Sequence, residues 1–246
     1  MWLLDLGNTR LKLAWAEAAG LGPVSALAHG EPDFEARLAR LLASRPAAPA
    51  CLASVAPAGV RLRVEAVLHS LGIVPRRAET RAECAGVRIA YADPARLGVD
   101  RFLGLLAARR RGGDWLVASF GSALTLDLLD ARGCHRGGLI GIAEQHQRAA
   151  LVERFPALQR GLGEPAVAWA TDTADAVAAG ARRQALGFVM ATWDDACAEL
   201  GHPPRLLLGG GDALRHADAL RRRLGAEVEL SEGLVLEGLA VFAGLA

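Results

Sequence analysis

Cysteine is scarce in this chain, and its placement argues against a zinc site or a disulfide framework. The four cysteines are widely separated: Cys51, Cys84, Cys134 and Cys197. No Cys-x-x-Cys or Cys/His spacing of a zinc site occurs, and reduced thiols are the default inside the cell. The six histidines are scattered along the chain, and we assign none of them a catalytic role.

Long apolar runs are also missing. A charged residue, Asp5, interrupts the N-terminus before the apolar core of a signal peptide could form. No apolar run reaches the ~20 residues that a membrane-spanning helix requires. We therefore expect a soluble, cytoplasmic protein with no membrane partner.

The chain has no excess of charge of either sign. The 28 basic and 27 acidic side chains nearly cancel. The densest arginine runs, at residues 109–111 and 221–223, close expected helices, where cations suit the helix dipole. We therefore expect no nucleic-acid partner. Apolar residues make up 52% of the 246 positions, which is ample for one large domain or two smaller ones.

The first dozen residues carry a turn that could bind an anion. An apolar strand runs into Asp5, and a glycine turn leads to a second apolar run at residues 11–15. Gly7 lets backbone approach a ligand closely, and Asn8 and Thr9 add short polar groups to turn N–H groups that can bind phosphate. Asp5, at the end of the strand, is placed to reach a metal ion. An ordinary hairpin with a Gly-Asn turn explains the same residues.

The same pattern recurs near the middle of the chain. Residues 115–118 form an apolar run, Ser119-Phe120-Gly121-Ser122 a turn with glycine in the same place, and residues 123–129 a second strand. A third glycine turn, at residues 209–212, follows another apolar run. Two such units about half a chain apart predict two similar halves facing each other across a cleft, with two loops on one triphosphate.

Periodicity places the remaining elements. Helices are expected at residues 34–43, 61–71, 100–111, 144–155, 173–200, 213–224 and 233–245, and strands at 1–17, 23–29, 50–55, from 73, at 115–142, near 206 and at 227–230. Strands that alternate with helices after a hairpin predict a mixed sheet with helices packed on it. A flexible Gly-Gly-Asp break sets the boundary between a first half, residues 1–112, and a second half, residues 113–246, each with one phosphate motif.

A carboxylate and a guanidinium stand together at one expected helix start. Tyr91 precedes the segment Gly98-Val99-Asp100-Arg101. Asp100 could be a general base for a substrate hydroxyl, with Arg101 binding a substrate anion. Spacing alone favours helix capping, because aspartate is a preferred N-cap. Thr173, in a capping-box-like run, is likewise either part of a helix cap or a donor to a substrate polar group.

Together these segments resemble the type III pantothenate kinases, a branch of the actin/hexokinase/Hsp70-like ATPase superfamily. The resemblance spans essentially the whole chain, and its motifs are specific in their order and spacing rather than one by one. They are Asp5-Leu6-Gly7-Asn8-Thr9 with Lys12, Gly98-Val99-Asp100-Arg101, Gly121-Ser122-Ala123 with Thr125 and Asp127, Gly137-Gly138, Thr173-Ala174-Asp175-Ala176 with Gly180, Gly209-Gly210-Gly211-Asp212-Ala213, and Leu236-Glu237-Gly238-Leu239.

The resemblance implies an α/β fold of two ribonuclease-H-like (actin-like ATPase) halves, and a homodimer. It implies transfer of the γ-phosphate of ATP to the primary alcohol of pantothenate, the first step of coenzyme A synthesis. Asp100 would be the proton acceptor, and Asp5 would hold Mg²⁺ through water. Pantothenate would contact Tyr91, Gly98, Val99, Asp100, Arg101 and Thr173. ATP would contact Asp5, Leu6, Gly7, Asn8, Thr9, Arg10, Leu11, Lys12, Gly121 and Ser122.

Two positions depart from the family pattern. The family's second phosphate motif normally begins with an aspartate that is associated with a monovalent cation, and here Ser119 takes that position. A hydroxyl can ligate K⁺ or NH₄⁺ but cannot neutralise it, so we expect weak or absent dependence on K⁺. The family's Pro-Gly after the glycine pair reads Ile142-Ala143. A catalytically weakened nucleotide-binding regulatory protein and another small-molecule kinase of the superfamily remain alternatives.

Overall fold

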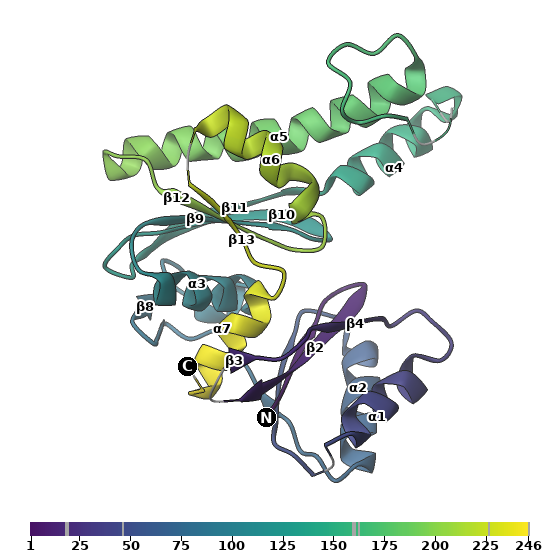
Figure 1. Cartoon of the computed structure of the whole chain (residues 1–246), viewed down its shortest axis with the longest axis vertical. Coiled ribbons are helices and arrows are strands. Elements are labelled where there is room, and N and C mark those ends of the chain that lie inside the picture. The colour runs from purple at the N-terminus through teal and green to yellow at the C-terminus, as the bar shows by residue number, and fades with distance from the viewer. Residues whose placement is uncertain (18–19, 46, 159–160, 162, 226, 246) are drawn as a thin grey trace. The chain divides into compact units, whose positions relative to one another are not determined.

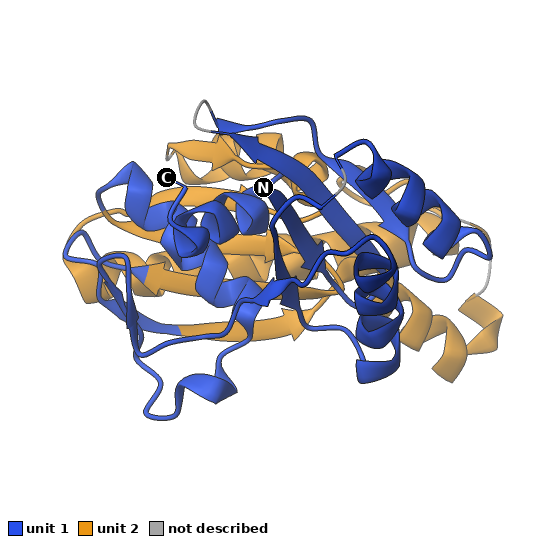
Figure 2. Cartoon of the chain, turned by 90° about the horizontal axis from the view of Figure 1, so that it is seen from below, with its two compact units in different colours: residues 1–113, 129–137, 233–246 blue, residues 114–128, 138–232 orange. Residues whose placement is uncertain are grey.

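The computed structural model describes residues 1–246 except 18–19, 46, 159–160, 162, 226 and 246 (Figure 1). The chain forms two compact units (Figure 2). Unit 1 comprises residues 1–113, 129–137 and 233–246, and unit 2 comprises residues 114–128 and 138–232. Unit 1 therefore takes in two segments that follow residue 113 in the sequence, one of them the C-terminal helix.

Unit 1 is built on a sheet with the order β3-β2-β1-β5-β6, in which β2 also pairs with β4. A short hairpin of β7 and β8 lies apart from this sheet. The strands are β1 (Trp2–Leu6), β2 (Arg10–Glu17), β3 (Gly20–Leu21), β4 (Ser25–Ala28), β5 (Ala50–Ser54), β6 (Arg76–Arg77), β7 (Glu83–Cys84) and β8 (Val87–Arg88). The helices are α1 (Phe34–Ala43), α2 (Ala58–Ser70), the 3₁₀ turn η1 (Pro94–Arg96), α3 (Val99–Arg111) and α7 (Leu234–Ala243).

Alternation along β1 decides which residues face which helices. Trp2, Leu4 and Leu6 belong to the apolar core that α1 and α2 complete. Because successive side chains of a strand point to opposite faces, Leu3 and Asp5 lie on the other face. Helices α3 and α7 pack against that face. The strand therefore presents one carboxylate to the helix whose first turn holds the Gly-x-Asp-Arg segment.

Helices α3 and α7 pack at backbone distance. A Cβ atom built on Gly238 of α7 would lie 1.9 Å from the carbonyl oxygen of Leu103 in α3. Only glycine permits this approach, so the Glu237-Gly238 pair near the C-terminus has a packing role in unit 1. In the same contact region, Arg111 Nη2 donates to Glu237 Oε2 at 2.6 Å.

Unit 2 is built around a sheet with the order β11-β10-β9-β12-β13. Its strands are β9 (Trp115–Phe120), β10 (Ala123–Leu129), β11 (His135–Ile142), β12 (Arg205–Gly209) and β13 (Val228–Leu230). Its helices are α4 (Glu144–Arg154), the 3₁₀ turn η2 (Pro156–Leu158), α5 (Thr173–Leu200) and α6 (Ala213–Leu224). Figure 1 shows α5 and α6 over one face of this sheet, where they share its apolar core.

The two sheets have the same local arrangement around their first strand. β1 lies between antiparallel β2 and parallel β5. β9 lies between β10 and parallel β12, with Ser119 opposite Gly209. The expectation of two similar halves, each a sheet with flanking helices, is confirmed.

Most expected elements are confirmed, and one strand was wrong. Helices 34–43, 173–200 and 213–224 end where the periodicity predicts, whereas α2 begins at Ala58, three residues before the expected position. No strand begins at Ile73-Val74; Ile73 is a buried core residue and Val74 is 80% exposed. Pro75 has no N–H to donate to a sheet, so pairing with β5 starts only at Arg76.

Candidate active site

Asp5 and Lys12 face each other across the first hairpin. They are paired in the antiparallel register of β1 and β2, so their side chains share the face that α3 covers. Burial and, after it, the charge of Asp100 raise the pKa of Asp5 to about 7, against the opposing charge of Lys12. The Asp5 carboxylate thus lies within electrostatic reach of Asp100, a residue 95 positions later in the chain.

The turn between these strands is closed by backbone. The N–H of Gly7 donates to the carbonyl oxygen of Arg10 at 3.0 Å, and the three residues Asn8, Thr9 and Arg10 are exposed. Leu6 and Leu11 flank the turn and are fully buried in the core. Of the residues predicted to bind ATP here, these two leucines can therefore offer only backbone groups, while the turn itself is open to a ligand.

Asp100 lies in the first turn of α3, but it is not the N-cap. The N-cap is Gly98, and the Oδ1 atom of Asp100 accepts from the N–H of Arg101 at 2.9 Å. A Cβ atom on Gly98 would lie 2.7 Å from that Oδ1, so glycine at this position makes room for the carboxylate. The capping hypothesis is right in part, since the side chain satisfies one first-turn N–H, and the second oxygen lies outside that bond.

Arg101 and Tyr91 come together at the same helix start. Arg101 is only 7% exposed, and its Nη1 donates to the hydroxyl of Tyr91 at 3.2 Å. The Tyr91 ring stacks on His135, with ring centroids 6.1 Å apart and planes at 9°. His135 is buried and its Nδ1 accepts from the N–H of Ala90 at 3.4 Å. This histidine packs against the predicted Tyr91, and no sequence pattern singled it out.

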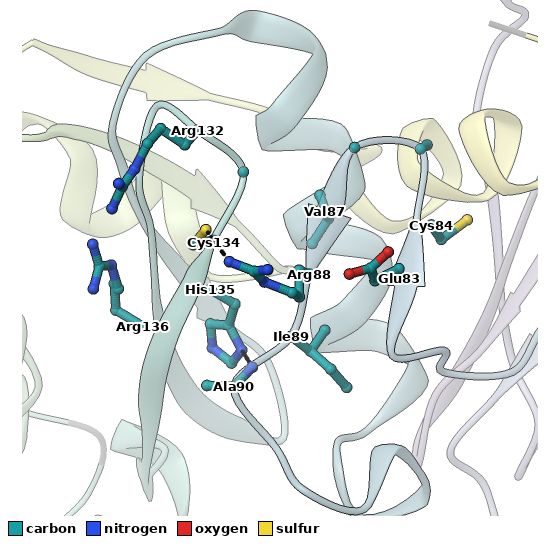
Figure 3. Close-up of a pocket in the computed structure, with 13 residues that line it drawn as sticks. Glu83, Cys84, Val87, Arg88, Ile89, Ala90, Arg132, Cys134, His135 and Arg136 are labelled. Carbon is teal, nitrogen blue, oxygen red and sulfur yellow. Dashed lines mark hydrogen bonds between the residues drawn. The ribbon is translucent and has the colours of Figure 1, made fainter.

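A cavity of about 800 Å³ borders this cluster in unit 1 (Figure 3). The strand β8 forms one wall and residues 132–136 the other. In Figure 3 the Arg88 side chain reaches across to the sulfur of Cys134, its hydrogen-bond partner at 3.3 Å. Two other arginines of the wall share Asp130: Arg132 Nη2 lies 3.2 Å and Arg136 Nη2 3.0 Å from its Oδ2.

Unit 2 carries the second glycine turn. The N–H of Gly121 donates to the carbonyl oxygen of Ala123 at 3.0 Å, which closes a tight turn after β9. Gly121 and Ser122 are partly exposed. The loop at residues 209–212 follows the adjacent parallel strand β12, so both loops lie at the carboxyl ends of neighbouring strands, where open α/β sheets bind ligands.

Thr173 is the first residue of α5 and is exposed. The N-cap is Asp172, whose Oδ1 accepts from the N–H of Ala174 at 2.8 Å. Asp175 accepts from the N–H of Glu164 at 2.7 Å. Asp172 thus caps the helix, whereas Asp175 holds the preceding loop at Glu164.

Among the residues the structure describes, no group of three or more histidine, cysteine, aspartate or glutamate side chains could hold a metal ion by itself. Mg²⁺ at kinase sites needs only one or two carboxylates together with phosphate oxygens and water. Asp5 fits that requirement: it is a partly buried carboxylate, and its pKa is raised first by burial and then by the nearby charge of Asp100. Within the described part of the chain, no helix is long and apolar enough to cross a membrane.

Comparisons with known proteins find relatives that match this chain over most of its length. A family model described as type III pantothenate kinase matches residues 1–195. The type III pantothenate kinase of Xanthomonas campestris pv. campestris is 43% identical over 98% of this chain and 96% of its own length. That of Xanthomonas oryzae pv. oryzae is also 43% identical over 98% of this chain and 96% of its own. The chain belongs to the type III pantothenate kinase family.

Solved structures support the fold of this type III pantothenate kinase family member. A putative Baf family transcriptional activator from Campylobacter jejuni superposes with a TM-score of 0.63 over 100% of both chains, at 16% identity. A putative 2-dehydro-3-deoxygalactonokinase from Sinorhizobium meliloti gives 0.56 over 98% of this chain and 97% of its own, at 17% identity. At such identities the likeness shows the fold alone, and that fold is the expected one of actin-like ATPases and sugar kinases.

Proposed function

We propose that this chain phosphorylates the primary alcohol of pantothenate with ATP, as its family membership indicates. The observation that carries this proposal is the meeting of Asp5, Lys12 and Asp100 on one face of the first sheet. Two carboxylates and one ammonium beside an open glycine turn suit phosphoryl transfer, which depends on positioning and charge neutralisation rather than on covalent chemistry.

Asp100 is the proposed general base. One of its oxygens is held by the N–H of Arg101, which fixes the carboxylate in one orientation at the start of α3. The proposed role of this carboxylate is to take the hydroxyl proton of the substrate.

Arg101 and Tyr91 are the proposed contacts of the pantothenate carboxylate. A guanidinium can bind a carboxylate with two parallel hydrogen bonds, and this pairing is strongest where water is excluded. Arg101 is 7% exposed and is oriented by the Tyr91 hydroxyl. Gly98, Val99 and Thr173 complete the proposed substrate contacts, of which Thr173 is exposed at the start of α5.

Asp5 and the glycine turns are proposed for the nucleotide. Bound Mg²⁺ would be held by Asp5 and would neutralise charge on the phosphates. Lys12 and the exposed residues Asn8, Thr9 and Arg10 would contact phosphate oxygens in unit 1. Gly121 and Ser122 would do so in unit 2. Ser119 in place of an aspartate leads us to propose weak or absent dependence on K⁺ or NH₄⁺.

We further propose a homodimer. Strand β11 is the terminal strand of its sheet, and Leu139, Ile140 and Ile142 on it are 46%, 65% and 52% exposed. A bare apolar edge strand is a template for pairing with another chain. Light scattering on the purified protein should give twice the 25.8 kDa of the chain. The proposed setting is the cytoplasm, where its four free cysteines would stay reduced.

One assay tests the proposed activity. Purified protein is incubated with ATP and Mg²⁺, with and without pantothenate, and phosphopantothenate is measured. Formation of that product only when both substrates are present supports the proposal. Absence of product under every cation condition would favour a catalytically weakened regulatory protein, and preference for a hexose would favour a sugar kinase.

A further inference from the structure

The two loops of unit 2 meet at Phe120. This residue ends β9, just before the Gly121 turn, and its carbonyl oxygen accepts from the N–H of Asp212 at 3.2 Å. Gly210 lies directly on the Phe120 backbone, with a φ of +94° and room for no Cβ, which would lie 2.2 Å from that oxygen. The position of one loop therefore depends on the position of the other, because both contact the backbone of Phe120.

A buried histidine contacts the side chain of Phe120. His216, in the first turns of α6, is 2% exposed and stacks on the Phe120 ring, with centroids 4.4 Å apart and planes at 17°. Its Nε2 lies 3.5 Å from Glu144 Oε2 at the start of α4. One imidazole thus contacts the strand that leads into the second phosphate turn and the helix that follows β11.

His216 is neutral in this environment. Desolvation lowers its pKa to about 4, and the charges of Arg182 from α5 and of Arg215 act in the same direction, while Asp212 opposes them. Burial raises the pKa of Glu144. The Nδ1 atom is buried and has no hydrogen-bond partner among the described residues. The same helix face otherwise carries the buried apolar residues Ala213, Ala217 and Leu220.

We propose that His216 is a positioning residue for the nucleotide, whose ring braces Phe120 and so keeps the turn at residues 119–122 and the loop at residues 209–212 in one arrangement. The proposal rests on the proposed function, in which the Gly121 turn binds phosphate. It assigns His216 no contact with substrate. The expected effect is therefore on nucleotide affinity, and the affinity for the alcohol substrate is untouched.

The test compares His216→Ala, which removes the stack, with His216→Phe, which keeps an aromatic ring but no ring nitrogen. For each, the Kd of ADP is measured by calorimetry without pantothenate, and the KM of ATP and of pantothenate by coupled assay. We expect His216→Ala to raise the Kd of ADP and the KM of ATP about tenfold, with the KM of pantothenate within twofold. His216→Phe should stay within threefold of the wild type.

His202→Ala is the matched control, because His202 lies in the same unit but is exposed and contacts Asp114 instead. It should change neither KM. Should His216→Ala fail to fold, Phe120→Leu trims the same stack from the other side and should give the same tenfold change.

A folded His216→Ala protein with an unchanged Kd for ADP, or with both KM values raised equally, would overturn the proposal. Wild-type protein that binds ADP but does not phosphorylate pantothenate would overturn the proposed function instead. The role of His216 would then be decided by the ADP measurements alone.

Discussion

The first hairpins of the two units share a framework and differ in charge. β1 and β9 are each followed by a glycine whose N–H closes the turn, and each strand pairs with a parallel strand that returns through helices. Two residues before that glycine, unit 1 has Asp5 and unit 2 has Ser119. In unit 1, the charged residues Lys12 and Asp100 lie near Asp5. In unit 2, the turn is preceded by Phe120, whose ring stacks on His216. The two units therefore share strand pairing around this turn but differ in the charge of the residue two positions before its glycine.

Removal of the base in unit 1 gives the largest expected effect. Asp100→Ala should lower kcat by about 10²- to 10⁴-fold, the usual contribution of a positioned general base. Because Asp100 is not the N-cap of α3, the helix should persist and nucleotide binding should remain. Steady-state kinetics and ADP calorimetry measure the two quantities.

Asp218→Ala, at an exposed aspartate paired with Arg221 in unit 2, is the control and should leave kcat unchanged. Near-normal turnover by Asp100→Ala would remove the base from the proposed mechanism and with it the functional contrast between the two units.

The sequence alone predicted most of the elements compared above, because local hydrophobic periodicity indicates hairpins and helices. The turns at Gly7 and Gly121 and the helix at residues 173–200 needed no tertiary information. The meeting of Asp5 with Asp100 did, since the residues are 95 positions apart and only the packing of α3 on the first sheet joins them. The resemblance to a family supplied that link before the structure did.

Two histidines near the proposed site residues could not be predicted, for reasons other than distance along the chain. His216 sits on the apolar face of α6 with Ala213 and Ala217, and that irregularity was its only sequence signal. His135 stacks on Tyr91, and no sequence spacing indicates that the two residues meet. The strand expected from Ile73 begins instead at Arg76, because Pro75 has no N–H to donate to a sheet.

Substitution of Asp5, the proposed Mg²⁺ ligand in unit 1, should give the next largest effect. Asp5→Asn should lower kcat/KM for ATP by about 100-fold, because a metal ion held at phosphate stabilises the transition state by several kcal/mol. Higher Mg²⁺ concentrations should recover part of the loss. The measurement is the rate as a function of Mg²⁺ for the variant, the wild type and the exposed-site control Asp33→Asn. A normal rate at ordinary Mg²⁺ would place the metal elsewhere.

The buried His216, which stacks on Phe120 in unit 2, should make the stability of the protein depend on pH. The pKa of His216 is about 4 when folded, against 6.5 for the ordinary side chain. The unfolded chain therefore binds the proton more readily, and stability from this group is complete above about pH 6.5 and is lost as the pH falls toward 4. Between pH 7.5 and 5.0 the loss is about 2 kcal/mol.

Urea unfolding of the wild type and of His216→Phe at both pH values isolates this contribution. Glu144 acts in the opposite sense, since its pKa is raised by burial, and because it contacts His216 the comparison is repeated with Glu144→Gln in both proteins. Equal losses in the two proteins would show that His216 is not neutral in the folded state.

The smallest expected effect tests whether the missing carboxylate of unit 2 matters. The wild type should respond to K⁺ or NH₄⁺ by less than about twofold, because the Ser119 hydroxyl can ligate a cation but cannot neutralise it. Ser119→Asp restores the charge that unit 1 has at Asp5, so its activity should become dependent on K⁺, by about threefold. Ser119→Asn, of the same size and neutral, should not. Strong stimulation of the wild type by K⁺ would mean that a hydroxyl serves where the family uses a carboxylate, and the two turns would then differ in sequence more than in function.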